Sequence, residues 1–151
     1  MGTVQYSIWI GAPPGLVWDI YTNLERIPEW QTGDPKVEEV SGQGHEIGAT
    51  YTVRRGPGAS RTTVTEAVRP SLHASRTSAP LGLSFDLITN LLPENGGTRL
   101  QLRADTHWPK GLRLVGRVVE FVFMNGSEAT RELGRLKVLV ESEAEKEDPT
   151  R

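Results

Sequence analysis

The hydrophobic pattern along the chain changes its period twice, and the first section reads as one strand followed by helix. From Val4 to Ile10 apolar and polar residues alternate, which predicts a half-buried β-strand. Pro14 then suits the first turn of a helix, and apolar residues continue at helical spacing up to Leu24. Pro28 ends or interrupts a second short helical turn just before Trp30. One strand and two short helices are therefore expected at the start of the chain.

A period of two then dominates the middle of the chain and predicts antiparallel strands. Turn residues separate these segments, and Asn95-Gly96-Gly97 is the clearest hairpin signal among them. The segments expected to be strands are Val37–Val40, Thr50–Arg55, Arg61–Val68, His73–Thr77, Leu83–Leu92 and Thr98–His107.

Beyond Trp108 the period changes to three and four, which predicts one long helix. Its apolar stripe runs from Leu112 to Val140 and is too wide for the narrow seam of a coiled coil, the competing interpretation. Such a wide face is better covered by a curved sheet. We expect one domain over residues 1–141, and a charged tail over residues 142–151 that frays.

Strands that follow one another between helices, rather than alternating with them, favour an α+β domain. The expected architecture is a bent antiparallel sheet wrapped around the long C-terminal helix, with two short helices after the first strand. The length of 151 residues agrees with a single domain, and a hydrophobic content of 36% together with 16 glycines lies in the ordinary globular range.

Composition excludes several classes of function. A net charge of −2 does not favour a nucleic-acid binder, and the absence of cysteine removes disulfides and thiolate chemistry. His45, His73 and His107 have no metal-ligand spacing, so neither a metal nor another cofactor is expected. No signal peptide and no apolar run near the ~18 residues of a membrane span is visible. We expect a soluble cytoplasmic domain.

A family resemblance rests on the first thirty residues. The segment Ile8–Trp30 reads IWIGAPPGLVWDIYTNLERIPEW: a strand, then Ala12-Pro13, Val17-Trp18, Pro28 and Trp30. With the long terminal helix, it resembles the START/Bet v 1-like (SRPBCC) superfamily, and within it the polyketide cyclase/dehydrase and lipid-transport group. The resemblance implies a helix-grip fold with a deep apolar cavity between sheet and helix, and a cavity mouth near Trp30.

The inward-facing residues of the predicted strands and the apolar stripe of the long helix are expected to line that cavity. Each apolar side chain of this set could equally belong to an ordinary hydrophobic core. Trp30 could stack on a flat ligand or only cap the sheet edge, and the small Gly126 could leave space for a ligand or allow close packing. Val68 and Ala104 share the inward parity. The candidate ligand-binding residues are Trp30, Tyr51, Val53, Arg55, Val64, Glu66, Phe85, Leu87, Leu100, Leu102, Val119, Val122 and Gly126.

The polar members of this set are the weak candidates for catalysis. Arg55 and Glu66 share the inward parity of adjacent strands, as a buried ion pair or a ligand-orienting pair would, and Tyr51 adds a hydroxyl. A β-bulge after Thr62 would instead turn Glu66 outward.

Charge is unevenly distributed along the chain. Between Thr50 and Thr77 there are five arginines and one glutamate, whereas acids outnumber bases from Leu24 to Gly48. Two solvated faces explain this pattern, and the alternative is an arginine-rich face that attracts an anionic partner such as an acidic carrier protein. Trp9 has outward parity and could mark an exposed contact surface.

The leading hypothesis is a protein that binds a small hydrophobic molecule, lipid-like or polycyclic, between sheet and helix. One alternative is a polyketide aromatase/cyclase or dehydratase in which Arg55, Tyr51 or Glu66 polarises a carbonyl or moves a proton. A second alternative is a protein-interaction module that uses the arginine-rich face.

Overall fold

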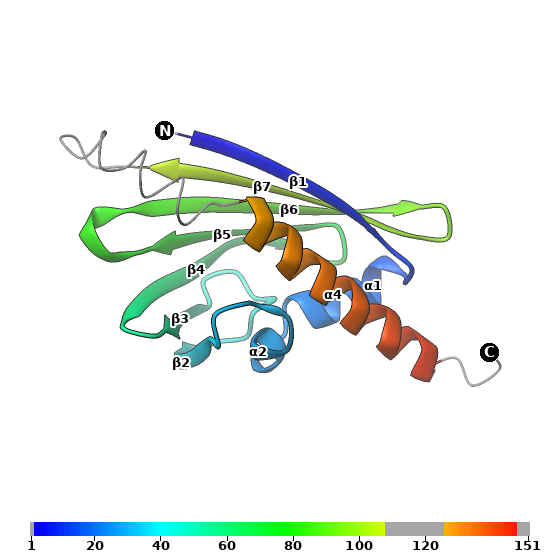
Figure 1. Ribbon diagram of the computed structural model, residues 1–151, viewed down its shortest axis with the longest axis horizontal. Helices are drawn as coiled ribbons and strands as arrows, with labels where there is room; N and C mark the ends of the chain where they lie inside the picture. The colour runs from blue at the N-terminus through cyan, green and yellow to red at the C-terminus, as the bar shows by residue number, and fades with distance from the viewer. Residues whose placement is uncertain (1, 108–125, 148–151) are drawn as a thin grey trace.

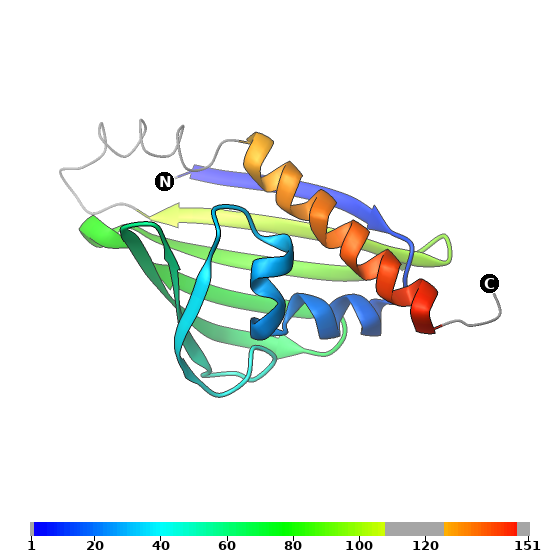
Figure 2. The ribbon, with the colours of Figure 1, turned by 60° about the horizontal axis from the view of Figure 1, so that its bottom comes forward.

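The computed structural model describes residues 2–107 and 126–147, and it shows one curved sheet with all its helices on one face (Figures 1 and 2). The strands are β1 (Gly2–Ile10), β2 (Lys36–Ser41), β3 (Thr50–Arg55), β4 (Gly58–Val68), β5 (Leu72–Ser78), β6 (Ser84–Glu94) and β7 (Gly97–His107). The helices are α1 (Pro14–Tyr21), α2 (Ile27–Trp30) and α4 (Gly126–Glu147), with short 3-10 turns η1 (Leu24–Arg26) and η2 (Pro80–Gly82). The α+β helix-grip architecture is confirmed.

The sheet has seven antiparallel strands in the order β1-β7-β6-β5-β4-β3-β2. Every consecutive pair from β2 to β7 is joined directly, whereas β1 and β2 occupy opposite edges. The segment that holds α1, η1 and α2 therefore crosses the concave side, and Figure 2 shows it there together with α4. We call the face of the sheet beneath these helices the inner face.

The predicted hairpin at Asn95-Gly96 joins β6 to β7. Asn95 and Gly96 both have positive φ, at 48° and 77°, which is the backbone geometry of a two-residue hairpin turn. Gly97 follows with a different requirement: a Cβ there would collide with the Ile10 carbonyl oxygen and the Trp9 ring. The turn and the absence of a side chain let β7 approach the end of β1.

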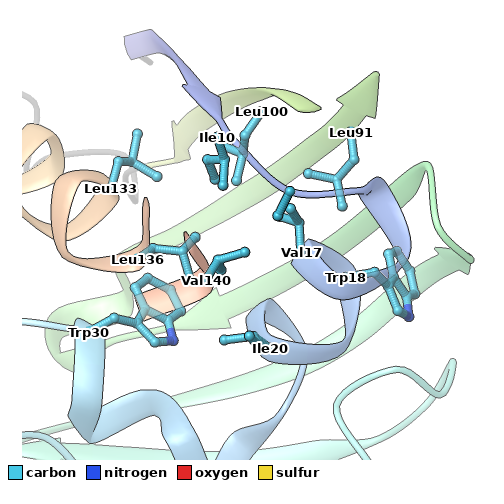
Figure 3. Close-up of a cluster of buried hydrophobic side chains, with 11 residues drawn as sticks. Ile10, Val17, Trp18, Ile20, Trp30, Leu91, Leu100, Leu133, Leu136 and Val140 are labelled. Atoms are coloured by element: carbon cyan, nitrogen blue, oxygen red, sulfur yellow. The ribbon is translucent and has the colours of Figure 1, made fainter. Parts of the chain in front are cut away.

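The alternation expected for β1 is present. Tyr6 pairs with Leu102, and Ile10 pairs with Thr98, so these two residues and the alternate residues of β1 in phase with them lie on the inner face. At that end of the sheet aliphatic side chains from β1, α1, β6, β7 and α4 form a closed core (Figure 3). We call this cluster the aliphatic end; its members are Ile10, Val17, Leu91, Leu100, Leu133, Leu136 and Val140, and none is more than 5% exposed.

A register shift in β4 overturns part of the expected parity. Val64 pairs with Ser75, but Glu66 pairs with Ala74, so Thr65 is an extra residue in the strand. The shift lies slightly further along the strand than the bulge after Thr62 that the sequence suggested, and it likewise turns Glu66 outward. Glu66 is exposed and lies on the outer face, and Val68 is 55% exposed. The inward placement of both residues was wrong.

The structure describes α4 only from Gly126 onward. The first half of the predicted apolar stripe, including Val119 and Val122, lies outside the described residues, and Gly126 is the first residue described in the helix. α4 continues past residue 141 to Glu147, and Glu143 is ion-paired with Arg26 at 3.0 Å. The charged segment expected to fray is thus helical as far as Glu147. None of the described helices has the length and apolar character needed to cross a bilayer.

Candidate functional site

The strand register arranges the inner face in rows that cross the sheet from strand to strand. Tyr51 pairs with Thr62, Thr62 with Thr77, Thr77 with Phe85, and Phe85 with Thr106. Four of these five side chains carry a hydroxyl group. We call Tyr51, Thr62, Thr77 and Thr106 the hydroxyl row.

Hydrogen bonds link part of this row. Thr62 Oγ1 and Thr77 Oγ1 are 2.8 Å apart and buried. Burial raises the pKa of Tyr51 to about 12, although a hydrogen bond with the Thr62 side chain and the Arg55 charge act in the opposite direction. The Tyr51 phenol is therefore protonated at neutral pH and available as a hydrogen-bond donor.

The next rows toward the aliphatic end contain more aliphatic side chains. Val64, Ser75, Leu87 and Ala104 face one another in register, and Thr89 pairs with Leu102 one row further. Leu87 and Leu102 are only partly buried, as is Phe85 in the hydroxyl row, whereas Leu100 in the aliphatic end is fully buried. Large apolar side chains on the concave side of the sheet are thus incompletely covered.

A row of aromatic rings lies above this part of the sheet. Trp30 stacks on Tyr21 with 5.7 Å between centroids, and His73 contacts both Tyr21 and Trp18 edge to face at 5.8 and 5.7 Å. The Tyr21 hydroxyl lies 2.7 Å from Thr89 Oγ1 on β6. α1 and α2 supply three of the four rings, so the two short helices bring aromatic side chains onto the inner face.

His73 connects the inner face to the loop between β2 and β3. Its Nε2 lies 2.8 Å from the Gly44 carbonyl oxygen, and burial lowers the pKa of the ring. Because a carbonyl only accepts, the neutral ring donates its Nε2–H to Gly44. Gly44 also packs against the Thr22 backbone so tightly that a Cβ would not fit. His73 therefore holds this loop against the end of α1.

Polar contacts at the end of α2 form the rim of the site. Arg55 has the inward parity expected of it, but it is exposed and donates to the Thr32 carbonyl oxygen at 3.2 Å and to the Gln31 side chain. Glu132 of α4 accepts hydrogen bonds from the Thr32 backbone N–H and hydroxyl, at 3.1 and 2.9 Å. Arg55 and Glu132 thus fix the α2 end between β3 and α4.

The structure brings together most, but not all, of the expected ligand-binding residues. Tyr51, Val53, Val64, Phe85, Leu87, Leu100 and Leu102 share the inner face, with Trp30 above it. Glu66 lies outside, so the proposed Arg55–Glu66 pair does not form. Of the three weak catalytic candidates, Tyr51 alone is partly buried, while Arg55 is exposed at the rim.

Sequence reasoning missed the buried polar lining. Thr62, His73, Ser75 and Thr77 are each less than 9% exposed, and all belong to the inner-face rows. A signal existed, because His73, Ser75 and Thr77 alternate along a single strand with the inward parity. The described residues contain no cluster of His, Asp or Glu that could hold a metal ion.

The outer surface has less unbalanced charge than the sequence suggested. Arg54, Arg61, Arg69 and Arg76 form ion pairs with Glu38, Glu39, Asp19 and Asp86 at 2.8 to 3.5 Å. All four acids come from other segments of the chain, and so the local excess of arginine is offset by folding.

Trp9 is not the free contact surface that its outward parity suggested. Its indole N–H donates to the Glu94 carbonyl oxygen at 2.8 Å, and the ammonium of Lys137 lies 5.1 Å from the ring centroid. Trp9 therefore serves the packing of β1 against the β6–β7 hairpin and α4.

A separate groove of about 850 Å³ lies between the α1–α2 segment and β2 with its following loop. Its lining includes Asp19, Leu24, Pro28, Val37 and Val40, and none of the expected ligand-binding residues that lie in the described strands or α2 lines it. The groove and the inner face are thus different sites.

The sequence of residues 1–141 matches the family model described as polyketide cyclase / dehydrase and lipid transport. The chain belongs to this family. A cavity that binds a hydrophobic ligand is typical of this family. No curated protein matches the chain significantly.

Solved structures agree with this family assignment at the level of the fold. The chain is similar to a norcoclaurine synthase point mutant from Thalictrum flavum in complex with a transition-state analogue, with 13% identity, TM-score 0.72 and 94% and 95% of the two chains covered. It is also similar to Ara h 8.0201, with 14% identity, TM-score 0.67 and coverage of 93% and 98%. The Bet v 1-like fold is confirmed.

A third similar structure is DynU16, a protein of the dynemicin biosynthetic locus, with 19% identity and TM-score 0.69. The alignment covers 94% of this chain but 48% of DynU16, so the chain spans about half the length of that protein.

Proposed function

We propose that this protein binds a small hydrophobic molecule, lipid-like or polycyclic, between the inner face of the sheet and the C-terminal helix. The observation that carries the proposal is the incomplete burial of Phe85, Leu87 and Leu102 on the concave side of the sheet. Each square ångström of apolar surface removed from water contributes about 25 cal/mol, so a ligand that covers these side chains is bound favourably.

The hydroxyl row supplies the orienting groups that such a site needs. Ligand sites are mostly apolar and contain a few polar groups at fixed positions. Tyr51, Thr62 and Thr77 are such groups, since Thr62 is hydrogen-bonded to Thr77 and Tyr51 lies beside Thr62 in register. They would fix one end of a ligand whose remaining surface contacts Phe85, Leu87 and Leu102.

Native mass spectrometry of gently purified protein tests the proposal. We expect a non-covalent added mass, or uptake of N-phenylnaphthylamine with a rise in its fluorescence. Leu87→Trp on the inner face should reduce either signal at least fivefold, because the larger ring occupies ligand space. Leu92→Trp is the matched control: it lies on the same strand but faces outward and is 44% exposed.

Two results would contradict the proposal: no bound mass and no probe uptake by the folded wild-type protein, or equal loss of binding in both variants. Urea unfolding checks that Leu87→Trp is folded. Catalysis at the same site is the alternative, and it would appear as recovery of a supplied poly-β-ketone with a changed mass.

A further inference from the structure

The indole N–H of Trp30 makes no hydrogen bond to the described part of the protein. The residue closes α2, is only 6% exposed, and packs with the aliphatic end through its ring system. In Figure 3 its six-membered ring is directed toward Leu136, and its nitrogen lies on the opposite edge. Among the described residues, Trp30 Nε1 has no hydrogen-bond partner, although the atom is buried.

An unpaired buried N–H is costly and uncommon. Buried tryptophans usually find an acceptor for this group, and Trp9 shows the ordinary solution in the same chain, with its N–H bonded to Glu94 at 2.8 Å. A buried Trp30 N–H without an acceptor lowers the stability of the folded protein. A bound molecule that accepts this hydrogen bond would remove the penalty. An indole nitrogen only donates, so the missing group must be an acceptor.

The neighbouring polar groups do not supply that acceptor. Tyr21 covers one face of the Trp30 ring, and its hydroxyl is engaged with Thr89. The Glu132 carboxylate is directed at Thr32, from which it accepts two hydrogen bonds. No oxygen of the described residues accepts a hydrogen bond from Trp30 Nε1. We therefore expect the acceptor to come from the ligand.

We propose that Trp30 Nε1 donates a hydrogen bond to a carbonyl-type oxygen of the ligand, so that the site prefers a ketone-bearing polycycle over a hydrocarbon of the same shape. This inference rests on the proposed function. Apolar contacts with Phe85 and Leu87 would serve both kinds of ligand alike, and Trp30 would discriminate between them.

Fluorenone and fluorene form a matched pair of probes, because they differ only by a ketone at one ring carbon. Their affinities are measured for the wild-type protein, Trp30→Phe and the control Trp9→Phe, whose indole N–H is satisfied within the protein. Wild type and Trp9→Phe should bind fluorenone about three- to tenfold more tightly than fluorene, as expected for one neutral hydrogen bond. Trp30→Phe should bind the two probes alike.

A second measurement needs no variant that could fail to fold. In nitrogen–proton correlation spectra of the wild-type protein, the Trp30 indole resonance should move downfield with fluorenone and much less with fluorene. The Trp9 indole resonance should stay in place with both.

Equal affinity of the wild-type protein for both probes, an unmoved Trp30 resonance, or a ketone preference that survives in Trp30→Phe would overturn this inference while leaving hydrophobic binding intact. An unmoved resonance would also be the result if a buried water accepts the N–H. Failure of the wild-type protein to bind either probe would overturn the proposed function together with this inference.

Discussion

The two ends of the inner face share strands β6 and β7 but differ in the chemistry of their side chains. At the aliphatic end, Leu91, Leu100, Leu136 and Val140 are at most 2% exposed and carry no polar side-chain atom. In the hydroxyl row, buried threonines and Tyr51 stand beside a partly buried Phe85. The two ends also differ in what covers them.

Helices account for this contrast. α4 contributes Leu133, Leu136 and Val140 to the aliphatic end, and α1 contributes Val17, so that end is closed by the protein's own side chains. Over the other rows α1 and α2 contribute aromatic rings that touch one another as well as the sheet. One end of the face therefore holds the fold together, and the other is where we propose that a ligand binds.

The largest effect should come from opening the aliphatic end. Leu136→Ala removes a fully buried side chain, and such a change costs about 2–5 kcal/mol of unfolding free energy. Urea unfolding measures this cost. Val138→Ala, two residues away and 69% exposed, should stay within about 0.5 kcal/mol of the wild type. Similar losses of unfolding free energy in the two variants would show that α4 does not have one buried and one exposed face.

A smaller effect should appear in the hydroxyl row at high pH. Burial raises the pKa of Tyr51 in the folded protein to about 12, above its usual value of 10, so the folded state holds this proton more tightly than the unfolded state. The resulting stability is complete below pH 10 and is lost as the pH rises toward 12, by about 2–3 kcal/mol in total.

Tyr51→Phe should remove this pH-dependent part. Unfolding free energies of both proteins are compared from pH 8 to pH 12, and the difference between them isolates Tyr51 from the other tyrosines. The two curves should be parallel below pH 9 and converge above it. Parallel curves over the whole range would show that Tyr51 ionises as easily in the folded state as in the unfolded chain.

The smallest effect concerns the hydrogen bond between Thr62 and Thr77. Thr62→Val leaves the buried Thr77 hydroxyl without this partner and should cost about 1–2 kcal/mol. The double variant Thr62→Val/Thr77→Val should cost less than the sum of the single changes, since neither hydroxyl of this pair is then left without the other. Thr63→Val, on the outward parity of the same strand, is the control and should be nearly neutral. Additive single changes would show that the two hydroxyls are not coupled.

Much of the fold could be predicted because local signals agreed with one another. The alternation from Val4 to Ile10, the Asn95-Gly96 turn and Pro14 at the helix start each specify an element through its own neighbours. Parity then placed Tyr51, Val64 and Leu87 on one face correctly.

Parity failed where one extra residue entered a strand. No glycine or proline stands near Thr65 to mark the shift, so nothing local distinguishes a bulged strand from a regular one. The position of Glu66 depends on that single residue.

The candidate site could be predicted only in part, since its polar contacts join distant segments. His73 acquires its partner Gly44 from a loop 29 residues earlier, and Trp30 meets Tyr21 through the turn between two helices. The outer arginines likewise find their acids across strands, as Arg76 does with Asp86 in register on β6. Only the folded arrangement shows these pairs.

The placement of β1 and β2 at opposite edges of the sheet has a mechanical consequence. Residues 11–35 must connect one edge to the other across the concave side, so this connection links the two edges although no strand pairing joins them. Arg26 binds Glu143 of α4 near the middle of the connection, and Arg55 of β3 binds Thr32 near its far end. These contacts, rather than the length of the chain, hold the connection over the sheet, and a movement of either edge is therefore transmitted to α1, α2 and α4.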